Sequence, residues 1–210
     1  MVKHEVRVYI EGGATGRTAD NDFRRGWKKF LSELHELAME HGYHRLNVIR
    51  GKGRANTFNL FVKHKKIWPN DLLVLLADSE TAVPNNASVW KIVGDRDKWQ
   101  KPAWASDRHL YLMVHFVETW LLTDQDALKQ FFKAGLKLNF LPTSNLENRP
   151  KTEIEKALKQ ATKDTKKGAY THGQAHEIIE LVDPNKVKTL QHGNRLFTSL
   201  RELIEENPAG

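Results

Sequence analysis

The chain has 210 residues, of which 40% are hydrophobic and 28% charged, and its 33 lysines and arginines against 26 acidic residues give a formal net charge of +7. This is the composition of a folded globular protein, and the lack of cysteine excludes disulfide scaffolds, thiolate metal sites and cysteine nucleophiles. No apolar run approaches the roughly 20 residues that cross a bilayer, and the first residues lack the apolar stretch of a signal peptide, so we expect a cytoplasmic protein without a membrane partner.

The first part of the chain alternates between patterns typical of strands and of helices. Residues 4–10 alternate apolar and polar side chains, which predicts a strand, and residues 22–41 carry apolar side chains at helical spacing. Residues 46–49 predict a second strand and residues 55–66 a second helix. Six consecutive apolar residues at 72–77 predict a strand that is covered on both faces. This order predicts a βαβαβ unit with a mainly parallel sheet flanked by helices.

Helices dominate the expected second part. Residues 81–104 show no clear period and contain three tryptophans, which predicts a long ordered loop. Asp107 is expected to cap a helix that runs to residue 122, and Asp124 to cap the next one. Later helices are expected at residues 152–161, opened by a capping box of Thr152 and Glu155, and at 176–182 and 196–205. The chain is therefore interpreted as a single domain over residues 1–210, with an α/β core (1–125) and a helical C-terminal extension (126–210).

Three carboxylates follow the predicted strands where those strands end. Glu11 follows the first strand, and Asp78 and Glu80 follow the buried third strand. Because the carboxyl ends of parallel strands share one edge of the sheet, where ligands bind, these side chains are expected to converge. Clustered carboxylates repel one another unless a cation lies among them, and their oxygens suit Mg²⁺ or Mn²⁺. The alternative is that they are capping and turn-forming acids.

Two segments are rich in basic residues. Residues 22–66 contain 11 basic and four acidic residues, and residues 149–167 contain seven and three. A positive surface attracts polyanions such as nucleic acids. Arg50, Lys52 and Arg54 follow the second strand, so they are expected near the carboxylates, where arginines suit phosphate contacts. The alternative is a solvated, lysine-rich surface.

A basic loop near residue 168 and a glycine pair add to this picture. Lys166 and Tyr170 are candidates for nucleic-acid contact, with Tyr170 stacking on a base, and Lys167 for neutralising charge on the scissile phosphate. The alternative is an exposed run of charge. Gly12 and Gly13 would let a phosphate approach the backbone. The ten histidines lack a zinc motif and are expected to be ordinary surface or core residues.

Two of these motifs resemble a known domain. A strand ending in Ile10-Glu11-Gly12 and a hydrophobic strand ending in Asp78-Ser79-Glu80 are similar to the TOPRIM domain of topoisomerases, primases and overcoming-lysogenization-type nucleases. Together with residues 9–13, 76–80, 112–124 and 164–170, they resemble a bacterial family of unknown function placed near TOPRIM.

The resemblance implies a TOPRIM-like (Rossmann-like) fold and roles for four acids. Glu11 would act as metal ligand or general acid/base, and Asp78 and Glu80 would hold Mg²⁺, although the second acid is commonly aspartate. Glu118 would be a further ligand from a helix after that strand; the alternative is a helix acid paired with a base.

These observations predict a Mg²⁺-dependent nuclease, or related phosphoryl-transfer enzyme, that acts on nucleic acid. The resemblance implies a role in phage defence. The alternative, also suggested by the resemblance, is a non-catalytic TOPRIM-derived binding or regulatory subunit that works with a partner ATPase. Glu80, in place of the usual aspartate, and the tryptophan-rich residues 81–104 favour this alternative, since exposed aromatic residues often mark partner surfaces. An enzyme acting on a small phosphorylated molecule is a third possibility.

Overall fold

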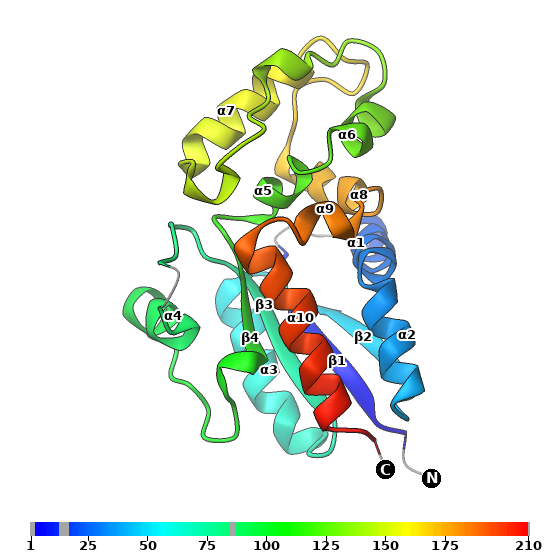
Figure 1. Ribbon diagram of the computed structural model, residues 1–210, viewed down its shortest axis with the longest axis vertical. Helices are drawn as coiled ribbons and strands as arrows, with labels where there is room; N and C mark the ends of the chain where they lie inside the picture. Colours follow the sequence, from blue (N-terminus) through cyan, green and yellow to red (C-terminus); the bar gives the residue numbers. More distant parts are fainter. Residues whose placement is uncertain (1–2, 13–16, 85–86, 210) are drawn as a thin grey trace.

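The computed structural model describes residues 3–12, 17–84 and 87–209. Within these residues, four parallel strands form a sheet of order β2-β1-β3-β4 (Figure 1). The strands are β1 (Glu5–Ile10), β2 (Arg45–Arg50), β3 (Leu72–Asp78) and β4 (Leu110–Met113). The predicted α/β class with a parallel, helix-flanked sheet is confirmed. Burial on both faces explains the continuous apolar run of β3.

Helices cover both faces of the sheet. On one face lie α1 (Arg17–Phe30), α2 (Ser32–Glu40) and α10 (Gln191–Glu206), and on the other lie α3 (Arg54–Ile67) and α4 (Val89–Asp97). Side chains of a strand alternate between the faces. Accordingly, Val8 joins the core beneath α1, α2 and α10, whereas Tyr9 joins the core beneath α3 and α4. The C-terminal helix α10 thus contributes directly to covering the sheet.

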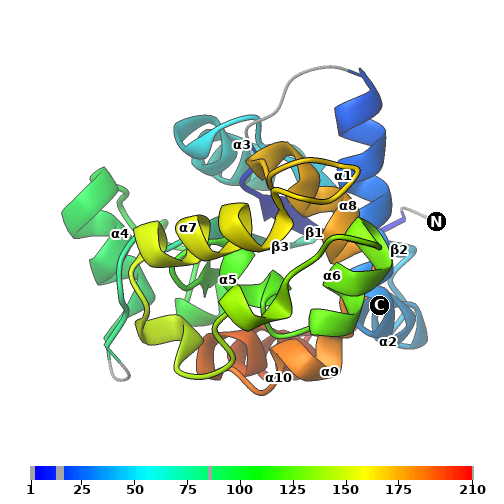
Figure 2. The same cartoon turned by 90° about the horizontal axis from the view of Figure 1, so that it is seen from above.

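The remaining helices gather above the carboxyl ends of the strands, as the two views show (Figures 1 and 2). They are α5 (Val117–Leu121), α6 (Gln125–Phe132), α7 (Lys151–Thr162), α8 (Ala175–Ile179) and α9 (Pro184–Val187), with the short 3₁₀ turns η2 (Leu138–Phe140), η3 (Leu146–Asn148) and η4 (His172–Gln174). A further 3₁₀ turn, η1 (Asp107–His109), leads into the amino end of β4. None of the described helices has the length and apolar character needed to cross a membrane.

The prediction of a single helix from Asp107 to residue 122 is wrong. The segment instead forms η1, then β4, which pairs with β3, and then α5. A short apolar run fits a buried strand and a buried helix equally well, so periodicity could not separate them. Ser106, not Asp107, caps η1, because its side chain accepts from the amide of Arg108. The cap predicted at Asp124 is confirmed: its Oδ1 accepts from the amides of Asp126 and Ala127.

Two helix predictions and one loop prediction also need correction. The helix expected over residues 22–41 is two helices, α1 and α2, separated at Leu31. The helix α7 exists, but it begins after Pro150 without a side-chain cap, so the capping box of Thr152 is absent. The segment 81–104 contains the helix α4. Its Trp90 and Trp99 are buried, and Trp99 stacks on Phe58 of α3 at a ring distance of 4.6 Å.

Candidate metal centre

The chain places the candidate site where the strand order reverses. From β1 the chain passes to β2 on one side, and from β2 it crosses to β3 on the other side. The crevice at the carboxyl ends of two such strands is where open α/β sheets bind ligands. Glu11 directly follows β1, and Asp78 ends β3. The site position therefore follows from the topology alone.

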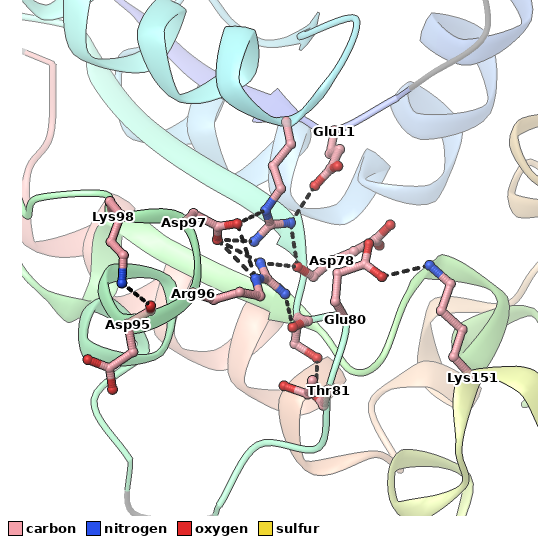
Figure 3. Close-up of polar contacts among 11 residues, drawn as sticks. Glu11, Asp78, Glu80, Thr81, Asp95, Arg96, Asp97, Lys98 and Lys151 are labelled. Carbon is pink, nitrogen blue, oxygen red and sulfur yellow. Dashed lines mark hydrogen bonds and ion pairs between the residues drawn. The ribbon is translucent and has the colours of Figure 1, made fainter.

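The convergence of the three acids, which the sequence predicts, is confirmed. Glu11, Asp78 and Glu80 each offer a carboxylate oxygen, and these oxygens lie within 4.8 Å of one another. Figure 3 shows the three side chains directed toward a common region. We call them the acidic cluster. A cluster of this donor type and spacing fits a hard divalent cation.

Within this cluster, the surroundings of Asp78 disfavour its charged form most strongly. Its Oδ1 atom is buried and has no hydrogen-bond partner among the described residues. Burial raises the pKa of Asp78 well above its ordinary value of 3.8, and the neighbouring charges of Glu11, Glu118 and Glu80 raise it further. A buried polar atom without a partner is rare in proteins. A cation bound here would supply that partner and relieve the repulsion.

Glu80 has an unusual backbone and a partner that the sequence did not reveal. Its φ angle of 62° lies in the left-handed region, which is uncommon for glutamate. Its amide donates to the carbonyl oxygen of His115 at 2.7 Å, which holds this conformation. Its carboxylate accepts from Nζ of Lys151 at 2.7 Å (Figure 3). Lys151 begins α7, 71 residues further along the chain, so no local pattern indicated the contact.

Arg54 holds the acidic cluster from the other side. Its Nη1 donates to Glu11 at 2.8 Å and to the carbonyl oxygen of Asp78 at 2.7 Å. Its Nε and Nη2 donate to the two carboxylate oxygens of Asp97, each at 2.8 Å. The pKa of Glu11 is raised by burial, and the Arg54 charge opposes that rise. Because these bonds occupy all three nitrogens and the side chain is 19% exposed, the predicted phosphate contact of Arg54 is corrected to a structural role.

Two further predicted contacts also need correction. The Arg50 side chain is only 2% exposed, and its Nη1 donates to Asp20 at 2.5 Å, so it does not present a surface to a phosphate. Tyr170 is buried, and its hydroxyl donates to Glu118, so its ring is not available to stack on a base. Lys52 also pairs with Asp20 but is half exposed.

The two lysines of the basic loop do not line the cavity at the acidic cluster. Lys166 and Lys167 are exposed, and Nζ of Lys167 lies 4.1 Å from the ring centre of Phe131. Within the described residues, Lys151 is the lysine that lines the cavity. It therefore occupies the place expected for Lys167.

A cavity of about 220 Å³ opens beside the acidic cluster. It is lined by Glu11, Gly12, Asp78, Met113, Phe116, Val117, Glu118, Lys151, His172, Ala175 and His176. Glu118 also lines this cavity, and one oxygen of its carboxylate, Oε1, accepts from the Tyr170 hydroxyl at 2.7 Å and lies 2.5 Å from Nδ1 of His172. A β-carbon at Gly12 would come within 2.6 Å of Phe23, so this glycine is needed for packing. Gly13 lies outside the described residues.

His176 is a buried histidine that couples the stability of the fold to pH. It is buried, and its Nδ1 accepts from Nε1 of Trp27 at 3.4 Å. Burial lowers the pKa of His176 from 6.5 to about 4, and Arg50 contributes in the same direction. Between these pH values the unfolded chain binds a proton that the folded protein does not, so the free energy of unfolding decreases as the pH falls.

We therefore expect His176→Gln to remove part of this pH dependence, on the order of 2–3 kcal/mol between pH 7 and pH 4. Urea unfolding of both proteins at several pH values measures it. If the free energy of unfolding changed with pH by the same amount in the variant and in the wild type, His176 would not titrate as described.

The fold and the site together define an α/β protein of Rossmann-like architecture with an acidic cluster at its topological switch point. A family model described as a domain of unknown function (DUF4276) matches residues 16–201, and the chain belongs to this family. No curated protein and no solved structure matches the chain.

Proposed function

We propose that the protein is a TOPRIM-like, Mg²⁺- or Mn²⁺-dependent nuclease or related phosphoryl-transfer enzyme that acts on nucleic acid. The observation that carries the proposal is the buried, unpartnered oxygen of Asp78 between two other carboxylates. Glu11, Asp78 and Glu80 would hold the cation. A divalent cation in such a site polarises a phosphoryl oxygen and promotes ionisation of a water molecule.

The chain supplies positive charge next to these acids. Lys151 lies 2.7 Å from Glu80, and its Nζ is 4.8 Å from the ring centre of Phe116, so its position is fixed from two sides. The neighbouring acids, Glu80 first, raise the pKa of Lys151, against the effect of burial. The ammonium group is therefore charged at neutral pH, and it is placed to contact a phosphate oxygen that enters the cavity.

A row of lysines on α7 supports nucleic acid as the substrate. Lys156, Lys159 and Lys163 are exposed and, at spacings of three and four residues, share one side of the helix. They line an open groove that also includes Thr152, Glu155, Gln160 and Ala169. The row lies along the helix whose first residue, Lys151, lines the cavity at the acidic cluster. A phosphate backbone is a polyanion that fits such a row.

The proposed activity is tested by incubating plasmid DNA and single-stranded DNA and RNA with the protein in Mg²⁺, Mn²⁺ or EDTA. We expect cleavage with either ion, none in EDTA, and a decrease of about 100-fold or more in Asp78→Asn. Asp95→Asn is the matched control, because Asp95 is exposed, its carboxylate pairs with Lys91 within α4, and Lys98 contacts only its backbone carbonyl oxygen among the described residues. Equal cleavage by Asp78→Asn and the wild type would remove the assignment.

The alternative is a non-catalytic subunit that works with a partner ATPase, and it drew in part on exposed tryptophans in residues 81–104. Of these, Trp90 and Trp99 are buried against the core, and Trp104 is partly exposed. Oligonucleotide binding without cleavage, in every metal tested, would favour this alternative over the nuclease. A role in phage defence is part of the proposal and needs a test in infected cells.

A further inference from the structure

We propose that His172 is the general acid of this site and that Glu118 and Tyr170 position it. This inference rests on the proposed phosphoryl-transfer function and assigns a proton-donating residue to it. Sequence reasoning placed His172 among ordinary histidines, since no zinc motif accompanies it.

The contacts of Glu118 fix the orientation of the His172 ring. The Glu118 side chain is 2% exposed, and its Oε1 accepts from the hydroxyl of Tyr170 at 2.7 Å and lies 2.5 Å from Nδ1 of His172. A buried carboxylate is stable only when hydrogen bonds satisfy it. With Nδ1 engaged by Glu118, the ring nitrogen that can donate a proton to a substrate is Nε2, which lies 3.5 Å from Oε1 of Glu155. This is the arrangement in which a carboxylate orients an imidazole for catalysis.

The backbone around His172 is fixed as well. Gln174 accepts the amide hydrogen of Thr171 on its side chain at 3.0 Å, and its own amide donates to the Thr171 carbonyl oxygen at 3.0 Å. These two bonds close η4 immediately around His172. The ring therefore projects from a defined turn, and its side chain is 59% exposed. His172 lines the same cavity as Glu11 and Asp78, so a substrate bound in that cavity would lie within reach of all three side chains.

The charges facing His172 favour its protonated form. The hydrogen bond to Glu118 raises the pKa of His172 most, and Glu155, whose Oε1 lies 3.5 Å from Nε2, also raises it. Burial and Lys151 oppose this rise. A general acid works best when its pKa lies near the pH at which the enzyme operates.

The proposed step balances as follows. A water molecule loses a proton to a carboxylate of the acidic cluster, and its oxygen forms a bond to phosphorus. The bond between phosphorus and the leaving oxygen breaks, with its electron pair going to that oxygen. His172 donates the proton on Nε2 to the leaving oxygen and becomes neutral, while the hydrogen on Nδ1 remains bonded to Glu118. Proton exchange with solvent restores both groups.

The test compares two phosphodiesters that differ in their need for an acid. In a dinucleotide the leaving oxygen is an alkoxide and requires a proton; in thymidine 5′-(4-nitrophenyl) phosphate it is a stabilised phenolate and does not. We expect His172→Gln to lower cleavage of the dinucleotide about 100-fold but cleavage of the nitrophenyl ester less than about fivefold. Glu118→Gln should move the basic limb of the pH–rate profile for the dinucleotide to lower pH. His44→Gln, at an exposed histidine, should change neither rate.

The outcomes separate this inference from the proposed function. Equal losses on both substrates in His172→Gln would show that His172 has only a structural role and would overturn the inference, while leaving the nuclease assignment intact. A wild-type protein that cleaves neither ester in Mg²⁺ or Mn²⁺ would overturn the proposed function, and the general acid with it.

Discussion

The asparagine variant of Asp78 is expected to be more stable than the wild type when no metal is present. Because the pKa of Asp78 is raised well above 3.8, the folded protein binds a proton more tightly than the unfolded chain does. Ionising Asp78 therefore costs stability, and the wild type in EDTA becomes less stable as the pH rises through the window above 3.8. Asp78→Asn keeps the shape of the side chain without the charge. We expect the free energy of unfolding to increase by about 1–2 kcal/mol at pH 7.5. Each kcal/mol corresponds to roughly 2–4 °C in melting temperature for a chain of this length.

Added Mn²⁺ should make the wild type more stable than Asp78→Asn. A cation that binds only the folded protein stabilises it by mass action, by about 2.7 kcal/mol at 100 times the dissociation constant. The wild type should gain this stabilisation, and Asp78→Asn should not. Thermal unfolding in EDTA and in Mn²⁺ measures both effects, with Asp95→Asn expected to behave as the wild type. An asparagine variant that is less stable than the wild type in EDTA, yet equally stabilised by Mn²⁺, would contradict this account of the site.

The second large effect is expected at Arg54. Arg54→Met removes hydrogen bonds to Glu11, to Asp97 and to the carbonyl oxygen of Asp78 at once. Arg96 remains on Asp97, but Glu11 loses the positive charge that opposes the rise of its pKa. We expect the free energy of unfolding to fall by about 2–4 kcal/mol, because removing one member of a largely buried ion pair leaves the other charge without a partner.

The control for this variant lies on the same helix. Lys63→Met changes an exposed lysine of α3 and is expected to alter stability by less than about 0.5 kcal/mol. Urea unfolding of the three proteins at pH 7.5 gives the comparison. A loss in Arg54→Met no greater than that in Lys63→Met would mean that Arg54 does not hold the acidic cluster together.

The acidic cluster was predictable because it depends on two simple regularities. Alternating and continuous apolar runs located β1 and β3, and the carboxyl ends of parallel strands meet at one edge. Glu11 and Asp78 therefore had to approach each other in any parallel sheet that places those strands side by side. The same reasoning missed β4, because its four apolar residues lie within a longer apolar pattern that also suits a helix.

The partners of the acidic cluster were not predictable in this way. Lys151 and His172 come from segments that fold over the edge of the sheet after turns with no regular period. The sequence placed Arg54 near the edge but did not show that Asp97 would draw its guanidinium group inward. Long-range pairing of this kind depends on tertiary packing, which local patterns do not encode.

Anomalous diffraction from a crystal soaked in Mn²⁺ tests the central claim most directly. The account predicts a peak at the carboxyl ends of β1 and β3, coordinated by oxygens of Glu11, Asp78 and Glu80, and no peak there in crystals of Asp78→Asn. A wild-type crystal with no density between these side chains, or the same peak in the variant, would contradict it.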